Sequence, residues 1–310
     1  MKNIFSIAIH GGAGTLVKGM MTPDIEARYK NDLKTATDAG YSVLEAGNTA
    51  VEAVEAAVVV LENSPLFNAG KGAVFTANET HEMDASIMDG KTLNAGSVSL
   101  ITGIKNPVSL ARDVMEKSEH VFLAGDGAHE FAKELRYKFE DASYFYDELR
   151  HQQWLQIKDT DSFQLDHSVK KDSKFGTVGA VACDKYGNIA AATSTGGMTN
   201  KKWGRVGDSP MIGSGNYAHN KTCAISCTGS GEYFIRGVVA YDVACLMEHK
   251  GMTVDQAAQE VIHKRILEIG GDGGLIAVDA KGNISMPFNT EGMYRASKSS
   301  NGAVEVFIYK

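Results

Sequence analysis

Cysteine and proline are scarce in this sequence, with four and five copies in 310 residues. Cys223 and Cys227 are four residues apart, but the segment between them has a strand pattern. We therefore expect buried free thiols rather than a metal site or a disulfide, which is typical of a cytoplasmic protein. Glycine is abundant, at 33 residues, and with so little proline it indicates close backbone approaches in ordered structure.

Long hydrophobic runs are also absent. No segment approaches the 18 apolar residues of a membrane-spanning helix, and the first residues lack the cleavage region of a signal peptide. The net charge of −7 provides no positive surface for nucleic acid or for an anionic membrane. These absences favour a cytoplasmic protein that binds neither nucleic acid nor a membrane.

Hairpin patterns dominate the predicted secondary structure. Turn residues separate neighbouring apolar runs, which predicts antiparallel strand pairs and one α+β domain over 1–310. The segment over about 147–176 is polar, and beyond a helical pattern at 144–154 we expect a mobile linker. Strands are predicted at 4–9, 82–90, 95–102, 177–183, 189–194, 223–228, 275–279, 284–288 and 303–309, and helices from residue 22 and at 49–61, 107–117, 127–138, 232–247 and 253–267.

The stretch 175–182 suggests an uncommon chemistry, because Thr177 follows Gly176 at the head of an apolar strand. If the peptide bond between them is cut, Thr177 carries both a hydroxyl nucleophile and its own base, the free α-amine. An α-amine titrates near 7.7–8.0, so a useful fraction is neutral at pH 7. The alternative is a buried strand with an opening turn, and the residues downstream decide between the two.

Two later segments carry groups that suit such a site. Residues 193–197 end the partner strand of the hairpin, so a hydroxyl there either hydrogen-bonds Thr177 or only caps the strand. Arg205 and Asp208 lie in a loop bounded by glycine and proline. Arginine binds a carboxylate in a two-pronged fork and aspartate binds an ammonium, so the pair would hold a free amino acid. A surface ion pair within the loop is the alternative.

Three further features leave alternatives open. The segment Thr228-Gly229-Ser230-Gly231 joins a strand to a helix, where backbone N–H groups suit an oxyanion; a phosphate is the competing ligand, but the lysine of a P-loop is missing. The loop 61–72 is apolar, and its carbonyls either bind a monovalent cation or pack in a turn. His10, before a glycine-rich turn, is more often structural than catalytic.

Six stretches together resemble the plant-type asparaginase / isoaspartyl peptidase family of N-terminal-nucleophile hydrolases. They fall in the family's order and span nearly the whole chain. They are Ile9-His10-Gly11-Gly12-Ala13-Gly14, Phe67-Asn68-Ala69-Gly70, Gly176-Thr177-Val178-Gly179-Ala180-Val181, Thr193-Ser194-Thr195-Gly196-Gly197, Gly204-Arg205-Val206-Gly207-Asp208-Ser209-Pro210 and Asn289-Thr290-Glu291-Gly292-Met293-Tyr294-Arg295.

The resemblance implies a four-layer αββα sandwich of two mainly antiparallel sheets between helical layers. It also implies self-cleavage into 1–176 and 177–310 and assembly as (αβ)2. By position, Thr177 is the nucleophile and Thr195 hydrogen-bonds it. The remaining implied roles are substrate binding by Arg205, Asp208, Thr228, Gly229 and Gly231, and a structural sodium ion on main-chain carbonyls of Leu61, Glu62, Phe67 and Ala69.

The implied activity is hydrolysis of side-chain amide bonds in isoaspartyl peptides and L-asparagine, with no cofactor for the chemistry. Substrates would carry a free α-amino group and a free α-carboxylate. A glycosylasparaginase-like amidase is one alternative, although that group usually has Asp before the nucleophile and T-G-N-G-D in the oxyanion region. The other is an uncleaved homologue that only binds aspartyl ligands.

Overall fold

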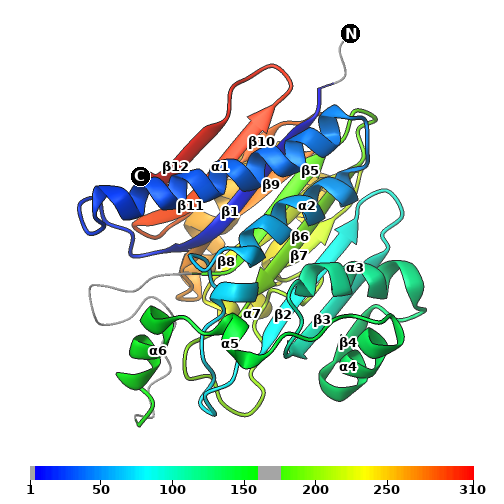
Figure 1. The fold of residues 1–310 in the computed structure, drawn as a ribbon. Helices are drawn as coiled ribbons and strands as arrows, with labels where there is room; N and C mark the ends of the chain where they lie inside the picture. Colours follow the sequence, from blue (N-terminus) through cyan, green and yellow to red (C-terminus); the bar gives the residue numbers. More distant parts are fainter. Residues whose placement is uncertain (1–3, 160–175) are drawn as a thin grey trace.

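The computed structural model describes residues 4–159 and 176–310. In this part of the chain the strands form two sheets, ordered β12-β11-β1-β5-β6-β2-β3-β4 and β10-β9-β8-β7 (Figure 1). The strands are β1 (Ser6–Gly14), β2 (Met83–Asp89), β3 (Ala95–Ile101), β4 (Phe122–Ala124), β5 (Val178–Cys183), β6 (Ile189–Thr195), β7 (Asn216–Ala218), β8 (Cys223–Gly229), β9 (Gly273–Asp279), β10 (Ile284–Ser285), β11 (Gly292–Ser299) and β12 (Glu305–Tyr309).

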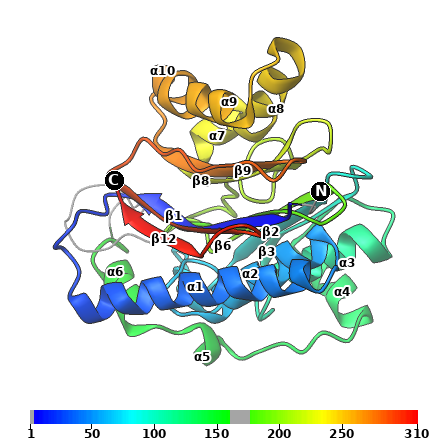
Figure 2. The same ribbon diagram turned by 90° about the horizontal axis from the view of Figure 1, so that it is seen from above.

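Helices cover the outer face of each sheet (Figure 2). The helices α1 to α4 pack on the larger sheet, and α7 to α10 pack on the smaller one. The helices are α1 (Pro23–Glu45), α2 (Ala50–Asn63), α3 (Pro107–Lys117), α4 (Gly125–Glu134), α5 (Ala142–Phe145), α6 (Glu148–Leu155), α7 (Gly231–Gly237), α8 (Val239–Lys250), α9 (Val254–Glu260) and α10 (Ile266–Glu268). A 3-10 helix, η1 (Gly70–Gly72), follows α2, and a π-helical segment, η2 (Val261–Arg265), joins α9 to α10.

The apolar core is divided by these sheets. One cluster joins α1, α2 and α3 to the larger sheet, a second joins α8 and α9 to the smaller sheet, and a third fills the space between the sheets. The third cluster includes Val181 from β5 and Ile276 from β9. Apolar side chains on both faces of a sheet must be covered, which explains why each sheet lies between two partners. The predicted mixed α+β class is confirmed.

Helix starts follow the expected capping chemistry. Thr22 accepts a hydrogen bond from Ile25 N before α1, and Thr49 forms a reciprocal capping box with Glu52 at the start of α2. The segment 232–247 is helical as predicted, but it forms two helices rather than one, because Val238 adopts a left-handed conformation (φ 47°) and separates α7 from α8. The strand β11 was not predicted as a strand, although it lies beside β1.

The hairpin after Thr177 is confirmed. Its strands β5 and β6 pair antiparallel from Val178–Ser194 to Cys183–Ile189, and β1 pairs with the other edge of β5. The predicted helical pattern at 144–154 becomes α5 and α6. The rest of the predicted linker, residues 160–175, lies outside the described residues.

The cysteines are free thiols, as expected, and three of the four are buried. No helix within residues 4–159 and 176–310 is both long and apolar enough to cross a membrane.

Candidate active site

Thr177 lies immediately before β5, in the strand that pairs with both β1 and β6. Its side chain is buried, and its hydroxyl donates to Thr195 Oγ1 over 3.3 Å and lies 3.3 Å from Ser209 Oγ. Thr195 is the last residue of β6, so the hairpin brings the two threonines together. Two neighbouring hydroxyls can therefore orient the Thr177 hydroxyl and exchange its proton.

A loop from the other half of the chain braces Thr195. The hydroxyl of Thr195 accepts a bond from Gly197 N at 3.1 Å. Asn68 Nδ2 donates to Gly197 O at 2.7 Å, and Gly196 N donates to Asn68 O at 3.0 Å. Asn68 therefore fixes the turn that follows Thr195.

The glycine-rich turn of β1 packs against Gly176. Gly12 has φ +112°, and a Cβ on it would lie 2.5 Å from the nitrogen of Gly176 and 2.9 Å from its carbonyl carbon. The Thr228 hydroxyl accepts from Ala13 N at 3.3 Å and lies 3.0 Å from where a Cβ on Gly176 would be. The peptide predicted to be cut therefore lies between this turn and Thr228.

Arg205 and Asp208 both face Gly231, the first residue of α7. A Cβ on Gly231 would lie 2.9 Å from Arg205 Nη2 and 3.1 Å from Asp208 Oδ1. Glycine therefore leaves a small space bordered by a guanidinium and a carboxylate. These two groups are complementary to the carboxylate and the ammonium of a free amino acid.

The carboxyl group of Asp208 is buried, and its Oδ2 has no hydrogen-bond partner among the described residues. Burial raises the pKa of Asp208 to about 7, although the positive charge of Arg205 opposes this effect. A buried carboxylate without a partner is costly, so it is ready to pair with a positively charged ligand group.

Arg205 is held by Glu232, in the first turn of α7. Arg205 Nε donates to Glu232 Oε1 at 2.8 Å and Nη2 donates to Oε2 at 3.0 Å. This two-pronged pair fixes the plane of the guanidinium. A ligand carboxylate must either share the guanidinium with Glu232 or displace it.

Gly229 ends β8 with φ +150°, close to the start of β9. A Cβ there would lie 2.4 Å from Asp272 O, so only glycine fits. The Ser230 hydroxyl also bonds to the carboxylate of Asp272. The strand-to-helix segment after Thr228 is thereby fixed in place, and Thr228 itself is fully buried.

The loop after α2 directs carbonyl groups toward two glycines. A Cβ on Gly70 would lie 2.3 Å from Glu62 O, and one on Gly72 would lie 2.1 Å from Phe67 O. Leu61 O and Ala69 O each accept one backbone N–H, which leaves a lone pair free on each. Main-chain carbonyl oxygens are ligands of the type that a hard cation takes. The four residues predicted to bind sodium are Leu61, Glu62, Phe67 and Ala69.

Sequence analysis missed three contributors to this region. Ser209 lies beside the Thr177 hydroxyl, Glu232 holds Arg205, and His10 contacts the Thr177 carbonyl. Ser209 lies within the Gly204–Pro210 stretch, so its position next to Asp208 was a usable signal. His10 was noted before a glycine-rich turn and lies in one of the six family-like stretches, but its contact with Thr177, 167 residues away, was not predicted. Glu232 lies 27 residues from Arg205, so the sequence did not indicate this pair.

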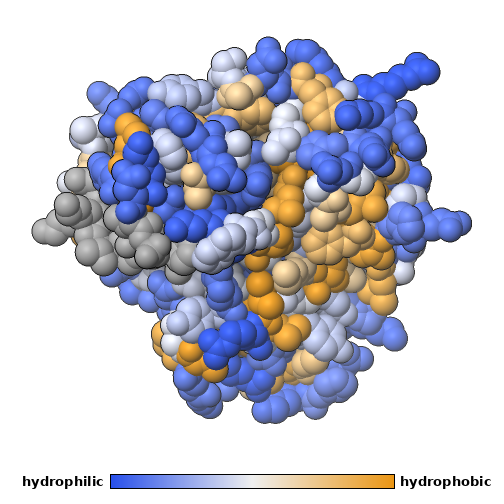
Figure 3. Space-filling model, turned by 90° about the horizontal axis from the view of Figure 1, so that it is seen from below, coloured by the Kyte–Doolittle hydropathy of each residue, from blue (hydrophilic) through white to orange (hydrophobic). Residues whose placement is uncertain are grey.

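The candidate site residues lie largely beneath the surface. Seen from below the view of Figure 1, hydrophobic side chains form a band beside hydrophilic ones (Figure 3). Thr177, Thr195 and Asp208 are, by contrast, almost completely buried. The site is therefore recognised from its internal contacts.

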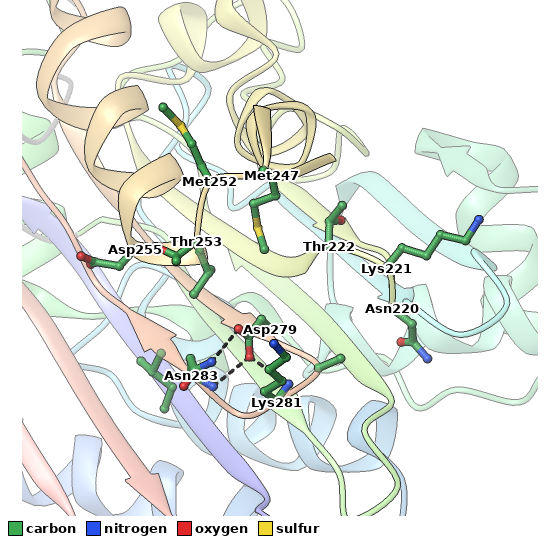
Figure 4. A pocket seen from close by; sticks show the side chains of 14 residues that line it. Asn220, Lys221, Thr222, Met247, Met252, Thr253, Asp255, Asp279, Lys281 and Asn283 are labelled. Atoms are coloured by element: carbon green, nitrogen blue, oxygen red, sulfur yellow. Dashed lines mark hydrogen bonds between the residues drawn. The ribbon is translucent and has the colours of Figure 1, made fainter. Parts of the chain in front are cut away.

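A separate hollow of about 710 Å³ lies between the α8–α9 connection and the turn that joins β9 to β10 (Figure 4). Its Asp279 is engaged by Lys281 N and by Asn283, so this carboxylate stabilises the turn. The hollow contains none of the predicted site residues, and we assign no chemistry to it.

Fold and site together define a class of protein: an α+β protein with a buried threonine at the head of a central strand, close to a carboxylate and a guanidinium. The family model described as "Asparaginase" matches residues 3–308. The chain therefore belongs to the asparaginase family.

Named relatives agree with this assignment. The chain is 50% identical over 293 residues to the isoaspartyl peptidase of Escherichia coli, covering 94% of this chain and 91% of the relative. It is 43% identical to a putative isoaspartyl peptidase/L-asparaginase of Dictyostelium discoideum, covering 98% of both chains. It is 38% identical to probable isoaspartyl peptidase/L-asparaginase 2 of Arabidopsis thaliana, covering 99% of both.

Proposed function

We propose that this chain is an isoaspartyl peptidase and L-asparaginase that uses Thr177 as its nucleophile after cleavage between Gly176 and Thr177. The observation that carries the proposal is the buried carboxyl group of Asp208, whose Oδ2 has no hydrogen-bond partner among the described residues and which lies beside Arg205. Together with the Thr177 hydroxyl, these groups match an aspartyl substrate at its ammonium, its α-carboxylate and its side-chain carbonyl. The family membership and the relatives' names support the same activity.

Maturation would proceed within one chain. The Thr177 hydroxyl attacks the Gly176 carbonyl carbon, the C–N bond breaks, and the acyl group passes from nitrogen to oxygen as an ester. Water then hydrolyses the ester to release the Gly176 carboxylate and the Thr177 hydroxyl. The proximity of Gly12 and Thr228 to Gly176 supports this step, because both restrict the peptide that must react.

Hydrolysis would then use the freed amine as the base. The amine takes the hydroxyl proton while Thr177 Oγ1 attacks the side-chain carbonyl of the substrate. The leaving nitrogen departs as ammonia from L-asparagine, or as the amine of the next residue from a β-aspartyl peptide. Water hydrolyses the acyl-enzyme in the second half of the reaction. Because both substrates present the same carbonyl, one site serves both.

The negative oxygen that forms in each half-reaction needs donors. The Thr228 hydroxyl and the backbone N–H groups near Gly229 are the candidate donors, since they lie at the junction of β8 and α7. Thr195 would hold the nucleophilic hydroxyl in line with the substrate through its 3.3 Å contact.

The proposal includes the αββα N-terminal-nucleophile fold, assembly as (αβ)2 and a cytoplasmic location. The arrangement of helices outside two facing sheets supports the fold, and free thiols support the location. The carbonyls of the loop 61–71 would hold a structural sodium ion. No catalytic step passes through this ion.

The decisive experiment is to incubate the purified chain at neutral pH and measure intact masses and N-terminal sequences, with Thr177→Ala as the control. We expect two wild-type fragments, one beginning at Thr177, and a single mutant chain. Release of aspartate from a β-aspartyl dipeptide and from L-asparagine then tests the activity. An uncut, inactive wild-type chain would support the alternative of a protein that only binds aspartyl ligands.

A further inference from the structure

His10 lies between the two sheets and is completely buried. Its Nδ1 is 3.0 Å from the carbonyl oxygen of Thr177, and its Nε2 is 2.9 Å from Ser226 Oγ on β8. Gly179 provides the room for this meeting, because a Cβ there would lie 1.9 Å from Ser226 Oγ and 2.6 Å from His10 Nε2. The imidazole therefore connects the residue that carries the nucleophile to the opposite sheet.

The tautomer of His10 follows from its partners. A carbonyl oxygen only accepts hydrogen bonds, so Nδ1 must carry the proton that is donated to Thr177. Burial lowers the pKa of His10 to about 3, so the ring is neutral at physiological pH and Nε2 carries no proton. Ser226 must then donate its hydroxyl proton to Nε2.

The same reasoning extends across the sheets. Ser226 Oγ, having donated to His10, can accept from the Thr193 hydroxyl on β6 at 2.7 Å, and the same hydroxyl can also donate to Gly215 O at 3.2 Å. Thr193 Oγ1 in turn accepts from Asn216 Nδ2 on β7 at 3.3 Å. The direction of donation is therefore fixed from Ser226 through His10 to the Thr177 carbonyl, and Thr193 and Asn216 hold the Ser226 hydroxyl in place.

The direction of the Thr177 carbonyl matters for the proposed function, on which this inference rests. Once the bond to Gly176 is cut, the Thr177 amine and side chain are attached to the strand only through the Cα–C bond. Rotation about that bond would swing the base and the nucleophile together away from the substrate. A hydrogen bond to the carbonyl fixes the peptide plane and so the axis of the Cα–C bond, while the contacts of the Thr177 hydroxyl with Thr195 and Ser209 oppose rotation about that axis.

We propose that His10 is a positioning residue, which holds the Thr177 carbonyl through Nδ1 and is itself held by Ser226, Thr193 and Asn216. It does not exchange protons with the substrate. Its effect is to keep the Thr177 amine and hydroxyl at the angle that the reaction needs.

Two variants of similar size test the two hydrogen bonds of the His10 imidazole separately, the one to Thr177 and the one to Ser226. His10→Asn keeps a donor near the place of Nδ1 and loses the contact with Ser226. His10→Gln keeps an acceptor near the place of Nε2 and loses the donor to Thr177. Because both variants remove the ring, a role in packing alone would affect them equally.

We expect His10→Gln to lower kcat and the rate of self-cleavage by about tenfold or more, since it leaves the carbonyl without its partner. His10→Asn should remain within about threefold of wild type, and KM should change little in either variant because Arg205 and Asp208 are untouched. Thermal melting and circular dichroism check that both variants fold.

Nitrogen NMR of the uncut Thr177→Ala chain measures the tautomer of the His10 ring independently of enzymatic activity. The His10→Asn variant in the same background assigns the signal. We expect a neutral ring with the proton on Nδ1 throughout pH 5–9. A proton on Nε2, or titration within this range, would overturn the proposal.

The kinetic outcomes are equally distinct. Equal losses in the two variants, or failure of both to be cut while wild type is cut and active, would overturn this inference alone. A wild-type chain that stays uncut and inactive would overturn the proposed function, and this inference with it.

Discussion

At the scale of single residues, Asp208 is buried and its Oδ2 has no hydrogen-bond partner among the described residues. This environment determines how the affinity for L-aspartate should depend on pH. The carboxyl group must ionise to pair with a ligand ammonium, and its pKa in the free protein is raised to about 7. Affinity for L-aspartate should therefore fall about tenfold for each pH unit below 7 and level off above it. Calorimetric titration between pH 5.5 and 8.5 measures this dependence.

Asp208→Asn should weaken binding of L-aspartate at pH 8 by at least about 100-fold, because the buried ammonium would lose its countercharge. Asp255→Asn is a matched control, since Asp255 bonds to Ser285 beside the separate hollow of Figure 4. An Asp208→Asn variant with near-normal affinity would exclude Asp208 as the ammonium ligand.

Gly12 should be required for cleavage, because it packs directly against the backbone of Gly176. Gly12→Ala places a methyl group 2.5 Å from the nitrogen of Gly176, in addition to the strain of φ +112°. We expect it to slow cleavage by more than about 100-fold, as judged by the amount of intact chain over time. Gly19→Ala is the control, because Gly19 also has a positive φ but no atom within 4 Å. Similar cleavage rates in the two variants would contradict the close approach of Gly12 to Gly176.

At the scale of elements, Glu62 joins three of them. Its carboxyl group accepts from Ser194 on β6, from Val108 N at the start of α3, and from Asn106. Burial raises the pKa of Glu62 from 4.5 to about 7. The group thus contributes stability below pH 4.5, and this contribution is lost as the pH rises through 7.

The free energy of unfolding should therefore include a term from Glu62 of roughly 3 kcal/mol that disappears between pH 4.5 and 7. Glu62→Gln cannot ionise, so the difference in stability between the two proteins should shift in favour of Gln as the pH rises. Urea unfolding in an uncut Thr177→Ala background at pH 5, 6 and 7.5 measures it. If the difference in unfolding free energy between the two proteins did not change with pH, the pKa of Glu62 would not be raised in the folded protein.

Local patterns predicted most elements but missed those that depend on distant partners. The hairpin of β5 and β6 has apolar runs around a turn of Tyr186-Gly187-Asn188, which is readable from the sequence. The strand β11 has no clean alternation, because Met293, Tyr294 and Ala296 are all buried. It is a strand because β1 and β12 pair with its two edges. The interruption of the helix at Val238 could not be predicted from the sequence either, since valine rarely takes a positive φ.

At the scale of the whole molecule, the two predicted fragments share one sheet. β1 comes from 1–176, yet both of its neighbours, β5 and β11, come from 177–310. β2 likewise pairs with β6 of the other fragment. The candidate site also draws on both halves, with Gly12 and Asn68 on one side and Thr177 and Asp208 on the other. Only the motif order in the complete chain predicted this assembly.

Refolding should therefore depend on concentration once the chain is cut. After denaturation, the wild-type fragments must meet before the sheet can form, whereas Thr177→Ala refolds as one chain. Stopped-flow refolding at concentrations tenfold apart should give rates that rise with concentration for wild type only. A concentration-independent wild-type rate would indicate that one fragment keeps its fold alone.

Because both predicted fragments contribute strands to one sheet, folding of the chain would have to precede its cleavage. Under the proposed self-cleavage, the bond before Thr177 would react only after Gly12, Thr195 and Thr228 have come together around it, and these residues are far apart in the sequence. A molecule cut in this way would therefore have folded correctly at least once, and the cut would remain as a permanent mark of that folding. Counting cut molecules in a cell would count past folding successes, including those of molecules that have since lost their structure.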